Sequence, residues 1–152
     1  MTRTTRIVFM MSLLCAAGAS TACGSTTEPT PAPTLSTEVF TGTVSPAGTA
    51  SHIFTVNYTD GSSDAGVTVT SLTSVATGAA QSMTIGIGFG SVSVGACSRS
   101  ASLSNAAAPL NTELPTTNTP FVAGQYCVQI YDNPDSPTVQ EPLTYSITVR
   151  HY

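Results

Sequence analysis

The sequence predicts an all-β protein, a single antiparallel β-sandwich of about seven to eight strands with a jelly-roll or immunoglobulin-like architecture. Three observations support this. Apolar residues recur with a period of two from about residue 37 onward, helical spacing is weak throughout, and turn-forming residues separate the alternating stretches. The 152 residues suffice for one ordinary domain. Short strands at regular spacing with turns between them are typical of a β-sandwich.

The first three strands are expected in residues 38–44, 51–58 and 67–73. In the first, Phe40 and Val44 fall on one face, and the sequence "SPAG" supplies the turn that follows. In the second and third, β-branched and aromatic residues alternate with polar ones, which is a strand pattern.

Residues 82–98 form the most unusual segment. Alternate positions carry large apolar residues on one side and bare glycine on the other, and glycine weakens a strand unless something must approach its backbone closely. Either a loop or neighbouring strand covers the glycine side, or a functional groove lies over it. The apolar side comprises Met83, Ile85, Ile87 and Phe89, and the glycine side comprises Gly86, Gly88 and Gly90.

Residues 102–120 contain three prolines and no sustained period, so we expect a long crossover with one short strand at most. Residues 124–132 and 143–152 alternate clearly and are expected to be the closing strands.

The first 22 residues have the layout of a secretory signal peptide. Arg3 and Arg6 precede an apolar stretch at residues 7–17, and small residues follow it. The apolar stretch is much shorter than the roughly 20 residues that a membrane-spanning helix needs. We therefore expect an exported protein.

Cys23 follows directly, in the sequence "STAC", and this segment resembles a bacterial lipoprotein signal, whose cysteine is acylated and becomes the mature N-terminus. The resemblance implies a lipid anchor at Cys23, although Ser20 stands where that family usually has an apolar residue. Ordinary cleavage, giving a periplasmic or secreted soluble protein, is the alternative. Residues 23–36 are rich in Thr, Pro and Ser and are expected to form an extended tether, about 40 Å long at about 3.1 Å per residue.

Residues 37–152 form the expected folded domain. Its segments "FTGTVSPAGTASHIFTV", "MTIGIGF", "AGQYCVQIYD" and "LTYSITV" resemble, in that order, bacterial pre-peptidase C-terminal domains. The resemblance implies a compact, non-catalytic β-sandwich of a surface protein, and some relatives bind calcium or polymeric substrates. Here "IGIGF" stands where the family commonly carries aspartates, so a metal role at that strand is not carried over.

Composition narrows the possible partners. Only 8% of residues are charged, and lysine and tryptophan are absent. After loss of the leader, Arg99 and Arg150 stand against eight carboxylates, giving a net charge of −6. Because affinity for nucleic acid depends on clustered Lys and Arg, we expect no nucleic-acid partner.

Cys97 and Cys127 remain in the domain once Cys15 leaves with the leader and Cys23 is acylated or removed. An even pair in an exported domain predicts a disulfide. A zinc site would need about four ligands, and neither cysteine has a histidine or second cysteine nearby in the sequence.

Evidence for catalysis is weak. His52 and His151 both lie in expected strands, in phase with apolar residues, where a histidine is more often packed than catalytic. A hydrolase would need one of them against a nucleophile, with loop carboxylates in support. We expect no cofactor.

Two acidic turns are candidate contact surfaces. Calcium prefers six to eight oxygen ligands, and loops can gather them, although Asp and Asn are also ordinary turn residues. Outward-facing side chains of the strand at 124–132 would extend this surface. The candidate residues for calcium or a partner are Asp60, Asp64, Asp132, Asn133 and Asp135, with Gln129 and Tyr131.

Together these patterns predict a non-catalytic, surface-tethered binding or spacer module of the cell envelope. It would be held to the membrane by lipid and would contact a protein or polysaccharide partner. The alternatives are a small secreted hydrolase using His52 or His151, and a structural subunit of a surface assembly.

Overall fold

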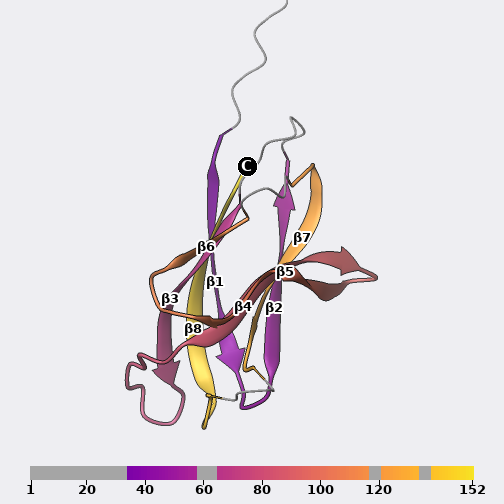
Figure 1. The fold of residues 1–152 in the computed structure, drawn as a ribbon. Coiled ribbons are helices and arrows are strands. Elements are labelled where there is room, and N and C mark those ends of the chain that lie inside the picture. Colours follow the sequence, from indigo (N-terminus) through magenta and orange to yellow (C-terminus); the bar gives the residue numbers. More distant parts are fainter. Residues whose placement is uncertain (1–33, 58–64, 117–120, 134–137) are drawn as a thin grey trace, which may run out of the picture. The chain divides into compact units, whose positions relative to one another are not determined.

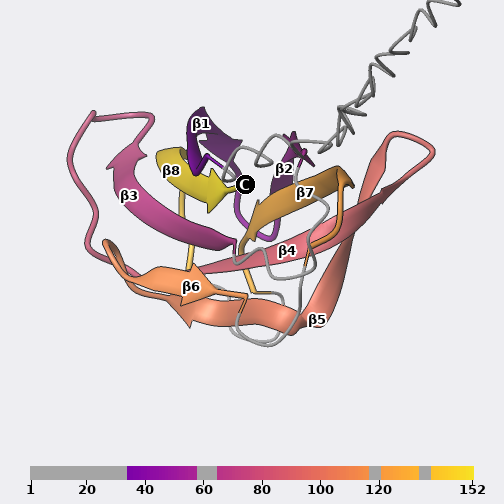
Figure 2. The ribbon, with the colours of Figure 1, turned by 90° about the horizontal axis from the view of Figure 1, so that it is seen from above.

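The computed structural model describes residues 34–57, 65–116, 121–133 and 138–152. These residues form two antiparallel four-stranded sheets packed face to face (Figures 1 and 2). The expected β-sandwich of seven to eight strands is therefore confirmed, with eight strands in the described part of the chain. The expected signal peptide, Cys23 and residues 24–33 of the expected tether lie outside the described residues.

The first sheet has the strand order β1-β8-β3-β6. Strand β8 lies between β1 and β3 and pairs with both along its whole length. The alternation in β3 shifts by one residue at Thr70, where a bulge interrupts its pairing with β8. The bounds are β1 Ser36–Val44, β3 Gly66–Ser74, β6 Glu113–Pro115 and β8 Leu143–His151.

The second sheet has the order β2-β7-β4-β5. Strand β7 is central and pairs with β2 on one side and with the glycine-rich strand β4 on the other, where Cys127 lies opposite Gly90. The bounds are β2 Thr49–Val56, β4 Ile85–Ser93, β5 Ala96–Ala108 and β7 Gly124–Tyr131.

The core lies between the sheets and follows from the period of two. In β8, for example, every second residue from Leu143 to His151 is buried, and the residues between them are partly or fully exposed. At one end of the core, Phe54, Phe89 and Phe121 pack against one another in edge and tilted geometries. The largest fully buried side chains are Tyr145, Phe89, Leu72, Ile85, Ile87, Ile130, Leu143, Ile147, Val44, Val56, Val67 and Val69.

Residues 82–98, treated in the sequence as one segment, contain all of β4, a two-residue turn and the start of β5. The turn residues Val94 and Gly95 both have positive φ, 49° and 77°, as a type I′ hairpin turn requires. Glycine suits this conformation, and Val94 is fully exposed at the tip.

The expected crossover at residues 102–120 is wrong in its first half. Strand β5 continues to Ala108 and pairs with β4, and only the short strand β6 matches the expectation. The alternation failed as a signal because Ser, Ala and Asn fill β5 on both faces, so no apolar contrast marks the strand. Its pairing partner β4 holds it in the sheet.

The glycine side of β4 is covered, as one of the two interpretations proposed. A Cβ on Gly86 would lie 2.4 Å from the Tyr131 ring, one on Gly88 would lie 2.1 Å from Ser104 Oγ, and one on Gly90 would lie 2.2 Å from the Ser98 carbonyl oxygen. The absent side chains leave room for these neighbours.

No helix in the described ranges is long and apolar enough to cross a membrane.

Candidate functional site

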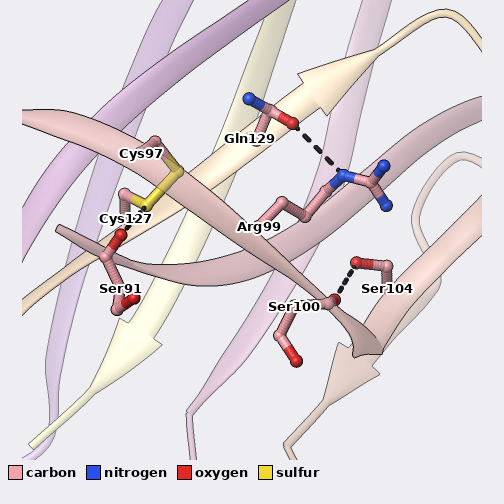
Figure 3. The surroundings of a disulfide bond; sticks show 7 residues. All are labelled: Ser91, Cys97, Arg99, Ser100, Ser104, Cys127 and Gln129. Atoms are coloured by element: carbon pink, nitrogen blue, oxygen red, sulfur yellow. Dashed lines mark hydrogen bonds between the residues drawn. A yellow bond between two sulfur atoms is a disulfide. The ribbon is translucent and has the colours of Figure 1, made fainter. Parts of the chain in front are cut away.

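The predicted disulfide between Cys97 and Cys127 is confirmed (Figure 3). It joins β5 to β7, two strands that lie on opposite sides of β4. Strands two apart in a flat sheet are separated by about 9 to 10 Å, yet the two Cα atoms are only 5.7 Å apart. Strand β5 must therefore leave the plane of the sheet and bend over β4 to reach its partner.

Gly90 is the position that permits this bend. It lies opposite Cys127 on one side and Arg99 on the other, and the backbone of Ser98 and Arg99 occupies the space of its missing Cβ. Between the pairs Gly88–Ser104 and Gly90–Arg99, four residues of β5 stand against one of β4, which is a large bulge. Glycine, bulge and disulfide together fix the course of β5.

Arg99 lies over the outer face of β7 as a result of the bend. Its guanidinium carbon is 3.9 Å from the centre of the Tyr131 ring, its Nη1 donates to Tyr131 Oη at 3.1 Å, and its Nε donates to Gln129 Oε1 at 3.2 Å. Tyr131 faces outward from the sheet as expected, but the expectation that it is an exposed contact residue is wrong, because the residue is only 4% exposed. Gln129 is half-buried. Both lie on the outer face of the sheet, but β5 covers that face.

Asp132, proposed as a contact or calcium ligand, is 2% exposed. Its Oδ2 accepts the N–H of Ala47 at 2.9 Å, and its Oδ1 accepts the N–H groups of Thr138 at 2.9 Å and Val139 at 3.3 Å. Burial alone would raise the pKa of this carboxyl. The backbone N–H groups, that of Asn133 included, outweigh it and lower the pKa below its ordinary value. Asp132 thus fastens the β1–β2 turn to the segment after β7.

The remaining acidic candidates, Asp60, Asp64 and Asp135, lie outside the described residues, and Asn133 is half-buried. Among the residues that the structure describes, no three His, Cys, Asp or Glu side chains come together as a metal-binding group.

His52 faces the space between the sheets near the β1–β2 edge. It stacks on Phe40, with ring centroids 4.8 Å apart, and its Nε2 lies 2.7 Å from Tyr145 Oη. Burial lowers the pKa of His52 and raises the pKa of Tyr145, because each loses hydration of its charged form. The neutral pair is therefore favoured, and the hydrogen bond ties β2 to β8.

His151 is 3% exposed at the end of β8. Its Nε2 lies 2.8 Å from Glu38 Oε1 in β1, and its ring packs against Phe54 at a centroid distance of 5.1 Å. The two histidines thus contact a tyrosine hydroxyl and a carboxylate, and each contact joins two strands.

A cavity of about 190 Å³ lies beside the disulfide, under the bulge of β5. It opens to solvent along Ser91 and Ser98, which are exposed, and reaches the aromatic end of the core. Its lining residues are Gly90, Ser91, Ser98, Ser100, Leu103, Phe121 and Tyr126.

Sequence reasoning did not identify this cavity, although it named Gly90 as part of a possible groove. The lining comes from β4, β5, β7 and the segment before β7, and Leu103 belongs to the part of β5 that was read as a crossover. The one available signal was the glycine alternation, which marked a place of close approach.

No protein-family model matches this chain, and no curated protein matches it.

Proposed function

We propose that this chain is an exported, lipid-tethered β-sandwich that binds or spaces at the cell envelope and carries out no catalysis. In this proposal Cys23 bears the lipid, residues 24–36 form the tether, and the sandwich is a pre-peptidase C-terminal-like domain. Two findings support it. The segments that carry the resemblance form β1, β2, β4, β7 and β8 of a β-sandwich, and the disulfide is compatible with an oxidising compartment.

The proposal that the chain is not a catalyst is supported mainly by the structural contacts that its titratable side chains make. The hydrolase alternative relies on His52 or His151 with loop carboxylates, and Asp132 is the one of its acidic candidates that lies in the described residues. Each is engaged in a contact that joins separate strands or turns. The described lining of the cavity contains neither histidine nor carboxylate. A nucleophile activated by a base, as in serine hydrolases, has no support in this arrangement.

Cell fractionation of the wild type and of a Cys23→Ser variant tests the tether. The wild type is expected in the membrane fraction and Cys23→Ser in the soluble fraction, because one acyl-bearing residue supplies the membrane affinity. A Ser20→Ala variant is the matched control, since it alters the same segment and keeps the cysteine. Equal partitioning of wild type and Cys23→Ser would contradict the lipid anchor.

A further inference from the structure

We propose that the cavity beside the disulfide binds one ring of a neutral, hydroxyl-rich oligomer, that is, a pyranose unit of an oligosaccharide. The inference rests on the proposed binding function and adds to it a location and a ligand class. The cavity is defined by the seven residues given above and is called the β5 cavity here.

The described lining of the β5 cavity contains no charged side chain. The described side chains of the β5 cavity are three serines, a leucine, a phenylalanine and a tyrosine, so a charged ligand would be desolvated without a counter-charge. A neutral ligand with hydroxyl groups can instead exchange hydrogen bonds with water for hydrogen bonds to Ser91, Ser98 and Ser100, at little net cost.

The aromatic residues of the lining suit the same class of ligand. Phe121 and Tyr126 pack edge to face, with ring centroids 4.3 Å apart and an interplanar angle of 68°. Phe121 is 3% exposed, and Tyr126 is half-buried. A pyranose ring carries apolar C–H faces and a rim of hydroxyls, which fits a site with an aromatic floor and serines near its mouth.

Size sets the scale of the ligand. Sites for drug-sized molecules have volumes of about 300 to 1,000 Å³. The β5 cavity, at about 190 Å³, is smaller, so it accepts a single ring. Because the cavity is open along Ser91 and Ser98, the rest of an oligomer can continue outside it.

The disulfide lies next to this lining, and Figure 3 shows it together with Ser91 and Ser100. Ser98 follows Cys97, Tyr126 precedes Cys127, and the Ser91 carbonyl oxygen lies 3.5 Å from Cys127 Sγ. A disulfide sulfur has no proton to donate, so the last is a packing contact. Two of the seven lining residues are thus adjacent to the covalent link and a third packs against it, which lowers the conformational cost of binding.

Isothermal titration of the full exported chain with three neutral trisaccharides, maltotriose, cellotriose and the trimer of N-acetylglucosamine, tests the proposal. A blocking variant, Ser91→Leu, places a larger side chain at the mouth of the cavity. Ser93→Leu is the matched control, because Ser93 is exposed on the same strand and does not line the cavity. Thermal unfolding of both variants verifies that they fold.

We expect at least one trisaccharide to bind with a Kd of about 1 mM or below, and Ser91→Leu to weaken this binding about tenfold or more while Ser93→Leu changes it less than about twofold. Absence of binding by all three sugars to the folded wild type would overturn the proposal. So would equal binding by wild type and Ser91→Leu.

A peptide of the form acetyl-Gly-Phe-Gly-amide is titrated in parallel. If it binds in a Ser91-dependent manner and the sugars do not, the cavity takes an apolar side chain and the saccharide assignment is wrong. The two proposals fail separately. If no sugar binds but membrane partitioning still depends on Cys23, only the proposal of sugar binding in the β5 cavity is contradicted. If the chain is cleaved without acylation, the lipid anchor is contradicted and the titration result still stands.

Discussion

At the scale of single residues, Gly90 determines whether β5 can bend over β4. A methyl group there would meet three backbone atoms, the Ser98 O at 2.2 Å, the Ser98 C at 2.7 Å and the Arg99 Cα at 2.8 Å. The backbone of β5 cannot move away easily, because the disulfide attaches this strand to β7. We expect Gly90→Ala to lower the free energy of unfolding by about 1 to 3 kcal/mol, as overpacking does, measured by urea denaturation.

Gly88→Ala is the control for this prediction, since it lies on the same strand and face. Its new methyl group would meet mainly the Ser104 side chain, whose Oγ can rotate away and whose Cβ would lie at 2.8 Å, while the nearest backbone atom, the Leu103 carbonyl oxygen, would lie at 3.1 Å. We expect the smaller loss at Gly88. A larger loss at Gly88 than at Gly90 would show that the backbone crossing does not limit this strand.

His52 makes stability depend on pH. Burial lowers its pKa in the folded state below the ordinary value of 6.5, so protonation favours the unfolded chain. The contribution of this group is therefore complete above pH 6.5 and is lost as the pH falls through the folded-state pKa. We expect the wild type to lose stability over this range more steeply than His52→Gln, in urea unfolding at a series of pH values. His151 is common to both proteins and cancels in the comparison.

Asp132 makes stability depend on pH in the acidic range, because its pKa lies below the ordinary value for a carboxyl group. Its pKa is held below 3.8, so its stabilisation is complete above that pH and is lost as the pH falls through the folded-state value. Asp132→Asn replaces one acceptor oxygen by a donor that faces backbone N–H groups. We expect a loss of about 1 to 3 kcal/mol at pH 7, shrinking toward zero in strong acid. A difference that persists unchanged in acid would contradict the role given to the charge.

At the scale of elements, β5 depends on covalent attachment. In the half of β5 that follows the bulge, the two faces of the strand differ little in apolar character. The other half is held to β7 by the disulfide, whose cysteines are 30 positions apart in the sequence. On the chain-entropy view, closing such a loop contributes about 3 to 4 kcal/mol. We expect reduction to lower the free energy of unfolding by about this amount, measured by urea denaturation with and without reductant. A reduced protein of unchanged stability would show that pairing with β4 suffices.

The elements also show where sequence reasoning succeeds. Strand β8 was predictable, because Leu143, Tyr145, Ile147 and Val149 mark one face and polar residues mark the other. Strand β5 was not, because its pairing comes from β4 and its small residues carry no period. The cysteine pair was predictable from counting alone, but the out-of-plane course that the pair imposes required coordinates.

The candidate site also combines features that the sequence predicts with features that require coordinates. The exposure of Tyr131 was misjudged because alternation reports which face of a sheet a residue occupies and says nothing of what covers that face. Arg99, which covers it, is 32 positions away in the sequence. Asp132 was recognised as a turn residue, whereas its three backbone partners come from two other segments.

At the scale of the whole molecule, the central proposal is that Cys23 anchors the chain to a membrane, and the disulfide joins β5 to β7 within the sandwich. The most direct test is the intact mass of the non-reduced protein purified from the membrane fraction, followed by peptide mapping. We expect a chain that begins at an acylated Cys23 and contains a Cys97–Cys127 linked peptide pair. A mature chain that begins elsewhere, or that carries an unmodified Cys23, would contradict it.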